Sequence, residues 1–222
     1  MSTIKGKARQ TTSIERVSEG ADVYIRMLRD GTVGVADLIA LWSLEGRIFT
    51  GTAGSGSSPE TFGATGTYDA TTFDMHLAIP SSVVVIPLEY TVVYEAFGTI
   101  LLVENVLQYG TGSVVGTATA DIPTSSNPNA GVASKCTLNF ASATGTALTT
   151  IAEELWHDSL QPVITRASAE GNVVKERFSY NWKDTGVLQT VGPSQQLVAF
   201  AAAQAGTGFI KFVYAELPVG SV

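Results

Sequence analysis

Alternation of apolar and polar residues is the main pattern of this chain, and it predicts β-strands. In Phe73–Ile79 the odd positions are apolar, whereas Asp74 and His76 lie between them. A period of two over this length is typical of a strand with one buried face. His76 then belongs to the polar face, where we expect an exposed or interfacial histidine. The same pattern is strongest in Val83–Phe97, which we predict to be one long strand.

Val83–Phe97 has an apolar residue at every even position, and these side chains are expected to share one buried face. The set consists of Val84, Ile86, Leu88, Tyr90, Val92, Tyr94 and Ala96. Glu89 and Glu95 lie on the other face and are expected to meet solvent or a subunit boundary. Pro87 cannot donate a ladder hydrogen bond, so it predicts an edge position or a bulge at that point.

Further strands are predicted after residue 98, separated by turns rich in glycine, proline, serine and asparagine. They are Thr99–Tyr109, Ser113–Asp121, Ser134–Phe140, Leu160–Ala169, Val173–Trp182, Gln195–Gln204 and Phe209–Leu217. About nine short antiparallel strands indicate an all-β sandwich, and the number suits a single jelly roll with its eight strands. An immunoglobulin-like sandwich is less favoured, because the Cys…Trp…Cys spacing is absent.

Two short segments have a helical pattern. Residues 35–45 place Trp42 and three aliphatic residues on one face of a helix. Thr150 and Glu153 form a capping box ahead of Trp156, which predicts a second helix. The all-β fold is therefore expected to carry one or two short helices.

Residues 1–65 and residues 66–222 differ in character, and we interpret them as two parts. Residues 1–30 are polar and end in the alternating run Val23–Leu28, which suits a short strand or an arm laid along a partner. Gly51–Gly66 is dense in glycine, serine and threonine and indicates a loop or linker. We expect an extended N-terminal arm and linker with a short helix in the first part, and the jelly-roll sandwich in the second.

A low content of charged residues argues against a free-standing monomer. Apolar residues make up 45% of the chain and charged residues 15%, below the roughly 25% typical of soluble domains. Such a sandwich would expose large apolar patches and unpaired strand edges. Closed symmetric association removes both, so we expect the chain to bind copies of itself, most readily as a homotrimer.

Charge is also unevenly distributed along the chain. The formal net charge is −7, and the residues after position 30 include seven basic and sixteen acidic ones. An acidic body argues against broad nucleic-acid binding by the fold itself. Lys5, Lys7, Arg9 and Arg16 make the start of the chain basic, so we expect it to touch nucleic acid or the acidic face of a neighbour. A solvated flexible terminus is the alternative.

Cysteine content and hydropathy indicate the cellular compartment in which the protein is made. Cys136 is the only cysteine, which excludes an intrachain disulfide and a cysteine metal cluster. Met1–Gln10 is polar and basic with no apolar stretch behind it, so we expect no signal peptide. No apolar run approaches the roughly 18–20 residues of a membrane span. We expect synthesis in a cytoplasm and no membrane contact.

No pattern of catalytic carboxylates or nucleophiles is recognisable. Glu89 and Glu95 share one strand face, where six residues separate them by roughly 20 Å, more than glycosidic mechanisms need. Glu153 and Glu154 would diverge on a helix. Nucleophile motifs are missing, and Cys136 lies in a strand-like run where a buried thiol is expected. We therefore expect no enzyme and no catalytic residues.

Candidate metal and phosphate ligands are equally sparse. His76 and His157 are the only histidines and are not at ligand spacing. His157 is expected near a helix end, where a cation complements the helix dipole. A calcium site remains an open alternative because three aspartates lie near predicted turns: Asp69, Asp121 and Asp184. Gly54–Gly56 resembles a fragment of a phosphate loop, but no Gly-Lys-Ser/Thr follows. We expect no cofactor and no metal.

Several segments resemble single jelly-roll virion proteins of environmental tailed and tailless bacteriophages. They are Ile79–Glu89, Tyr94–Gly98 and Gly206–Pro218, and the stretch from Leu28–Gly31 through Glu45–Arg47 is similar to the leader of the same group. The resemblance covers most of the chain, although its motifs are turns and strands and bring no functional residues. It implies a role in the shell or on its surface, with threefold or quasi-sixfold packing.

The expected function is that of a structural protein of a bacteriophage particle, made in the host cytoplasm and located in the virion. It would build, cement or decorate the capsid through contacts with copies of itself and with other capsid proteins. The basic arm, residues 1–30, would thread between neighbours or toward the packaged genome. The alternative is a receptor- or carbohydrate-binding module of a spike or fibre, which requires aromatic side chains on loop tips or on an exposed sheet face.

Overall fold

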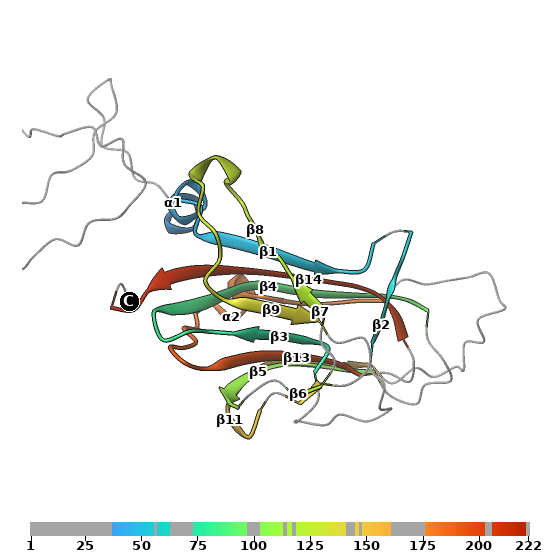
Figure 1. Ribbon diagram of the computed structural model, residues 1–222. Coiled ribbons are helices and arrows are strands. Elements are labelled where there is room, and N and C mark those ends of the chain that lie inside the picture. Colours follow the sequence, from blue (N-terminus) through green and yellow to red (C-terminus); the bar gives the residue numbers. More distant parts are fainter. Residues whose placement is uncertain are drawn as a thin grey trace, which may run out of the picture.

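Strands make up most of the part of the chain that the computed structural model describes (Figure 1). The described residues are 37–55, 57–62, 73–96, 103–112, 115–116, 119–140, 145–146, 148–160, 176–202 and 206–220. The helices are α1 (Leu38–Leu44) and α2 (Trp182–Thr185), and Pro128–Ala130 forms the 3-10 turn η1. Helix α1 confirms the helix expected within residues 35–45.

Two large antiparallel sheets contain nearly all of the described strands. The strands are β1 (Ile48–Ala53), β2 (Glu60–Phe62), β3 (Met75–Ala78), β4 (Val83–Ala96), β5 (Val103–Thr111), β6 (Val115–Gly116), β7 (Thr119–Asp121), β8 (Thr124–Ser125), β9 (Thr137–Phe140), β10 (Gly145–Thr146), β11 (Thr150–Leu160), β12 (Glu176–Asn181), β13 (Gln196–Ala202) and β14 (Gly206–Pro218). The first sheet has the order β12-β4-β14-β1-β8, with β2 also on β14, and the second has the order β11-β5-β13-β3-β9-β7. The expected antiparallel all-β sandwich is confirmed.

The eight principal strands pair in a nested way. Strand β1 pairs with β14, β3 with β13, β4 with β12, and β5 with β11, all antiparallel. In chain order, the first of these eight strands thus pairs with the eighth, the second with the seventh, the third with the sixth and the fourth with the fifth. Further ladders join β14 to β4 in the first sheet and β13 to β5 in the second.

Aromatic side chains dominate the core between the two sheets. Phe212 and Tyr214 stack with ring centroids 5.2 Å apart, and Tyr94 meets Phe178 edge to face at 5.9 Å. The second sheet contributes aliphatic residues to the same cluster: Met75, Leu77, Leu107, Leu138 and Leu197. Each buried aromatic ring removes about 150–250 Å² from water, worth about 4–6 kcal/mol at 25 cal/mol per Å². Apolar burial therefore holds the sheets together.

A second apolar cluster covers one end of the first sheet on its outer face. Trp42 of α1 is 6% exposed and packs with Ile86 and Leu217, and Trp182 of α2 packs against the same cluster. Asp37 caps α1 because its side chain accepts a hydrogen bond from the backbone N of Ile39 at 3.2 Å. The short helix is thus stabilised by its cap and by the burial of one tryptophan.

At Pro87 and Leu88, the buried side chains of strand β4 change from one face of the sheet to the other. Its ladder with β14 pairs Glu89 with Val213 and then Pro87 with Tyr214, so Leu88 is an extra residue. This confirms the bulge expected at Pro87. The even residues from 84 to 94 are buried as expected. Their expected common face is wrong, because Val84, Ile86 and Leu88 belong to the cluster under the helices, whereas Tyr90, Val92 and Tyr94, beyond the bulge, belong to the core between the sheets.

Strand β1 lies within the segment expected to be arm and linker. It pairs with β14 from Ile48 to Ala53, so these six residues belong to the first sheet. The loop expected at Gly51–Gly66 is wrong for Gly51–Ala53 and for β2. Glycine serves a packing purpose at Gly51, because a Cβ there would overlap the side chain of Leu138.

The helix expected around Thr150–Trp156 is wrong, because this segment forms strand β11. It pairs with β5 over its whole length, with irregularities between Ile151 and Glu153 and between Glu154 and Trp156. The extra residues bring both Leu155 and Trp156 toward the core. Ladder hydrogen bonds and tertiary packing thus override a local capping pattern.

Several expectations fall outside the described residues. These are the extended arm over residues 1–30, Asp69, and the strand expected at Leu160–Ala169 beyond its first residue. Within the described part of the chain, Ser113–Asp121 holds the short strands β6 and β7. None of the described helices has the length and hydropathy needed to cross a membrane.

Candidate interaction surface

The two carboxylates on β4 form surface contacts. Lys211 Nζ donates to Glu89 Oε2 at 3.2 Å, and Arg177 Nη2 lies 3.9 Å from Oε1 of the same carboxylate. All three side chains are partly exposed, so these ion pairs contribute about 0–1 kcal/mol each. Glu95 is also partly exposed. Glu89 therefore lies on the half-exposed outer face of the first sheet, as expected.

His76 is fully buried, which corrects the expectation of an exposed or interfacial histidine. It lies on the outer face of the second sheet, where Gln196 Oε1 lies 2.6 Å from Nε2 and Asn139 Nδ2 lies 3.5 Å from Nδ1. The amide oxygen of Gln196 only accepts, so Nε2 donates to it. The amide nitrogen of Asn139 only donates, so Nδ1 accepts and carries no proton, and the ring is neutral. Burial lowers the pKa of His76, and the hydrogen bond to Gln196 opposes this in part. A neutral imidazole ring can make both hydrogen bonds, to Gln196 and with Asn139.

His157 lies on β11, an edge strand, and not at a helix end as expected. Its Nδ1 is 3.4 Å from Glu154 Oε1, and its Nε2 is 3.9 Å from Glu104 Oε1 on the neighbouring strand β5. Glu153 points to the opposite face of β11, where it accepts a hydrogen bond from Tyr109 at 3.0 Å. The two adjacent glutamates therefore diverge, although on a strand and not on a helix.

The aspartates weighed as calcium ligands have separate structural contacts. Asp121 Oδ2 accepts a hydrogen bond from the backbone N of Thr52 at 3.2 Å. Asp184 lies in the first turn of α2. Within the described ranges, no three side chains of histidine, cysteine, aspartate or glutamate gather closely enough to hold a metal ion.

A buried carboxylate that sequence patterns did not single out lies near the end of β14. Glu216 is 6% exposed and accepts hydrogen bonds from the Ser134 hydroxyl and from the backbone N of Lys135 and Cys136, the latter two at 3.0 and 3.3 Å. The Tyr214 hydroxyl lies 3.0 Å from Ser134 Oγ. Because the single proton of Ser134 goes to the carboxylate, Tyr214 donates to Ser134.

This cluster fixes a loop and disfavours nucleophilic chemistry. Burial raises the pKa of the Cys136 thiol, and the charge of Glu216 raises it further. Burial likewise raises the pKa of Tyr214. A thiol that stays protonated is a poor nucleophile, and Cys136 is buried as expected. Glu216 therefore serves to tie residues 134–136 to the first sheet.

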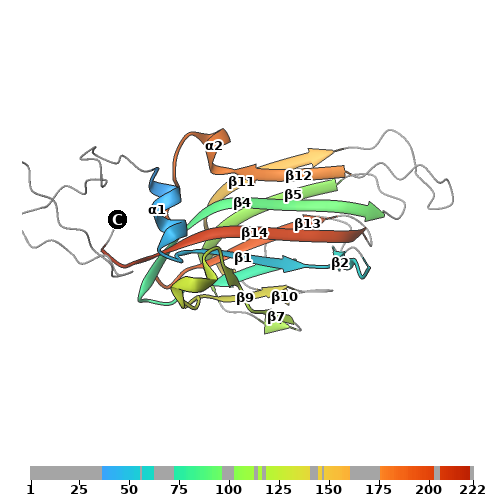
Figure 2. The ribbon, with the colours of Figure 1, turned by 90° about the horizontal axis from the view of Figure 1, so that it is seen from above.

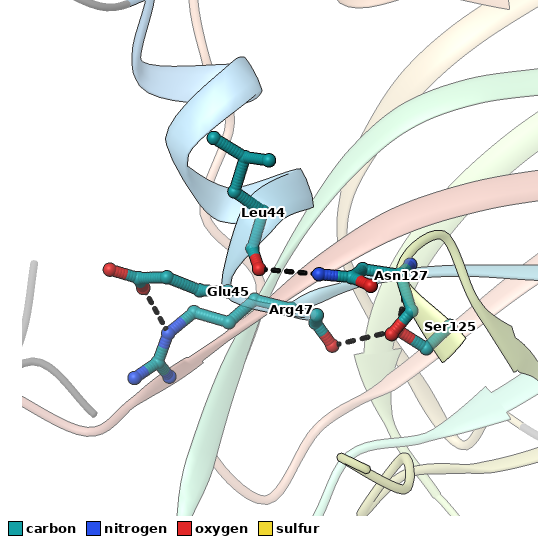
Figure 3. Close-up of polar contacts among 6 residues, drawn as sticks. Leu44, Glu45, Arg47, Ser125 and Asn127 are labelled. Carbon is teal, nitrogen blue, oxygen red and sulfur yellow. Dashed lines mark hydrogen bonds and ion pairs between the residues drawn. The ribbon is translucent and has the colours of Figure 1, made fainter. Parts of the chain in front are cut away.

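The turn after α1 is tied to the loop around η1, as Figure 3 shows. Asn127 Nδ2 donates to the backbone O of Leu44 at 2.7 Å, and the Ser125 hydroxyl donates to the backbone O of Gly46 at 3.2 Å. Arg47 Nε donates to Glu45 Oε2 at 2.8 Å in the same region. The contacts of Asn127 and Ser125 join segments about eighty residues apart in the sequence and fix where the chain enters β1.

Strand β11 is the most exposed long strand that the structure describes. It stands at the end of its sheet, and among the described strands its one ladder is with β5. Residues Thr150–Glu154 and His157–Ser159 are exposed, and the strand carries three acids, Glu153, Glu154 and Asp158. Figure 2 places β11 and β12, the end strands of the two sheets, on the same side of the sandwich. This side presents an open backbone edge with acidic side chains, which is suited to binding another chain.

Comparison with known proteins returned no relative, since no protein-family model, curated protein or solved structure matches this chain.

Proposed function

We propose that this chain is a structural protein of a bacteriophage particle, which builds, cements or decorates the capsid through contacts between subunits. We further propose that its sandwich is a single jelly roll and that it acts as a homotrimer without catalytic activity. Jelly rolls occur in viral capsid proteins, lectin domains and cupins, so the fold alone leaves the function open.

The observation that carries the proposal is the nested pairing of the eight principal strands. When an antiparallel ribbon of four strand pairs wraps around a core, its first strand pairs with its eighth, the second with the seventh, the third with the sixth and the fourth with the fifth. The pairs β1·β14, β3·β13, β4·β12 and β5·β11 follow this order. Wrapping also brings the third strand beside the eighth, as β4 lies beside β14. This arrangement supports the jelly roll.

The surface supports a role in assembly. Only 15% of the residues are charged, and β11 leaves an eleven-residue edge open among the described residues. Exposed apolar side chains lie on α1, after α2 and after β14, which all end on the side of the molecule where the C-terminus lies (Figure 1): Leu38, Leu44, Val187 and Val219. Both features expose surface that association would cover.

The placement of aromatic residues favours assembly over glycan binding. A sugar-stacking surface needs exposed aromatic rings. Four tyrosines are instead among the largest fully buried side chains: Tyr90, Tyr94, Tyr180 and Tyr214. The large apolar side chains that the described residues expose are all aliphatic. A receptor- or carbohydrate-binding module remains the competing proposal, and binding of the purified protein to a glycan array would support it.

Deletion of residues 2–20 tests the assembly role. We expect the truncated chain to keep the circular dichroism spectrum and melting temperature of the full chain, because the described sheets begin at residue 48. We also expect it to form far fewer closed oligomers in negative-stain electron micrographs. The full chain, purified and imaged in parallel, is the control. Normal assembly of the truncated chain would contradict the proposed role of the arm.

A further inference from the structure

We propose that the open edge of β11 binds the basic N-terminal segment, residues 4–10, of a second copy of this chain. This inference rests on the proposed function, because it names the partner of one subunit contact. The segment would lie alongside β11 as an added strand, with its lysine and arginine side chains on the face that carries Glu154 and Glu104.

The backbone of β11 provides the main-chain contacts. All of its ladder contacts within the described residues go to β5, so its other side offers N–H and C=O groups that a further strand satisfies. Open edges of this length are normally covered, shortened or protected by lysine and proline. Strand β11 contains neither residue, so its edge is chemically open to a partner.

The side chains of the edge select a basic partner. Glu154 on β11 and Glu104 on β5 lie on one face of the sheet, whereas the exposed Glu153 and Asp158 of β11 lie on the other face. The ion pairs of these acids within the described part of the chain are to His157 alone. Two β11 strands placed edge to edge would bring like charges together, which disfavours pairing of β11 with its own copy. A segment with several lysines or arginines removes that repulsion.

The chain itself carries such a segment. Lys5, Lys7 and Arg9 occupy every second position, and the first ten residues contain no acid. In an extended chain they lie on one side, about 7 Å apart. The rest of the chain beyond residue 30 has only seven basic residues against sixteen acids. The segment is thus the densest basic run available to complement the edge.

Position and length point to a neighbouring copy. In Figure 1, α1 lies beyond the first sheet and β11 forms the far edge of the second sheet. The 26 residues between the segment and Asp37 span up to on the order of 85 Å when extended, enough to reach an adjacent subunit. A contact from the arm of one copy to the edge of the next is heterologous, and three such contacts close a ring. The contact therefore fits the proposed trimer.

A charge-swap experiment on the full chain tests this contact. One variant reverses the edge, Glu104→Lys with Glu154→Lys, and the other reverses the arm, Lys5→Glu with Lys7→Glu. We expect each variant alone to fold normally by circular dichroism and to associate at least tenfold more weakly than the wild type in sedimentation. A chain that carries all four substitutions should regain association, because its acidic arm then matches the basic edge in every contact of the ring.

The matched control is Asp184→Lys, which reverses an exposed acid on α2 and should leave association unchanged. Carbodiimide cross-linking of mixed ¹⁴N- and ¹⁵N-labelled wild-type protein should join Lys5 or Lys7 to Glu104 or Glu154 between chains. Cross-links within one chain only, or a four-substitution chain that fails to regain association, would overturn this contact. If both variants associate like the wild type, the contact is wrong while the assembly role stands. A monomeric wild type would instead refute the assembly role.

Discussion

His76 and its amide neighbours form a polar group on a sheet face that is closed to solvent. The neutral ring meets Gln196 and Asn139, and a proton added to Nδ1 would face the amide nitrogen of Asn139. Protonation of the folded protein is therefore disfavoured by burial and by the loss of this contact. The alternation in the sequence predicted that His76 lies on the polar face of its strand, but it did not predict that this face is buried.

Stability should decrease as the pH falls below about 6.5, the ordinary pKa of histidine. The unfolded chain then takes up a proton at His76 that the folded chain resists, because the folded pKa is lowered. The free energy of unfolding falls by at most about 1.4 kcal/mol per pH unit from this group. Urea titrations of wild type and His76→Gln between pH 5 and 8 measure the effect. Equal pH slopes in the two proteins would show that His76 does not contribute.

Leu88 is the extra residue of the bulge in β4 and is 5% exposed within the cluster under the helices. Replacing it, Leu88→Ala, should lower the free energy of unfolding by about 2–5 kcal/mol through the cavity it leaves. The neighbouring change Glu89→Gln should cost less than about 1 kcal/mol, because its ion pairs are partly exposed. Chemical denaturation compares the two. A larger loss for the glutamate than for the leucine would refute this register.

Elements whose pattern agrees with their packing were predictable from the sequence. Strand β4 alternates over more than ten residues, and its extent, Val83–Ala96, matches the expectation closely. Strand β14 contains the expected Phe209–Leu217 and extends beyond it at both ends, to Gly206–Pro218. Strand β11 was missed because two irregularities in its pairing shift the alternation by one residue each, which hides the period of two. Strand β1 was missed because Gly51 and its neighbours resemble a loop, while their role is to admit Leu138. The strand conformation of both β11 and β1 is therefore determined by tertiary contacts and not by the local sequence pattern.

The surface edge of β11 and the loop tied by Glu216 had no signal in the sequence. An edge is defined by the strand that is missing beside it, and this depends on the order of strands in the sheet. The contacts of Glu216 with Ser134 and Cys136 join positions about eighty residues apart. Neither a local period nor a motif spacing carries such information.

At the scale of elements, Asn127 links α1 to the loop around η1. Its side chain donates to the backbone O of Leu44 and accepts from the backbone N of Asn129. Replacement by alanine should cost about 1–2 kcal/mol, because it removes both a cap and a helix-end contact. Asn129→Ala is the matched control, since only its backbone is used, and it should be nearly neutral in urea denaturation. Equal effects of the two changes would contradict this link.

At the scale of the whole molecule, three observations favour the proposed self-association. They are the open edge of β11, the exposed aliphatic residues near α1 and the low content of charged residues. A ring of three copies with heterologous contacts would bury an edge of every copy. The proposed virion role depends on this self-association.

Sedimentation velocity of the full chain at micromolar concentration distinguishes a self-associating chain from a monomer. We expect a closed trimer, with about three times the 23.3 kDa mass of one chain. The trimer should remain the main species when the concentration is varied tenfold. A stable, non-aggregating monomer across that range would refute self-association.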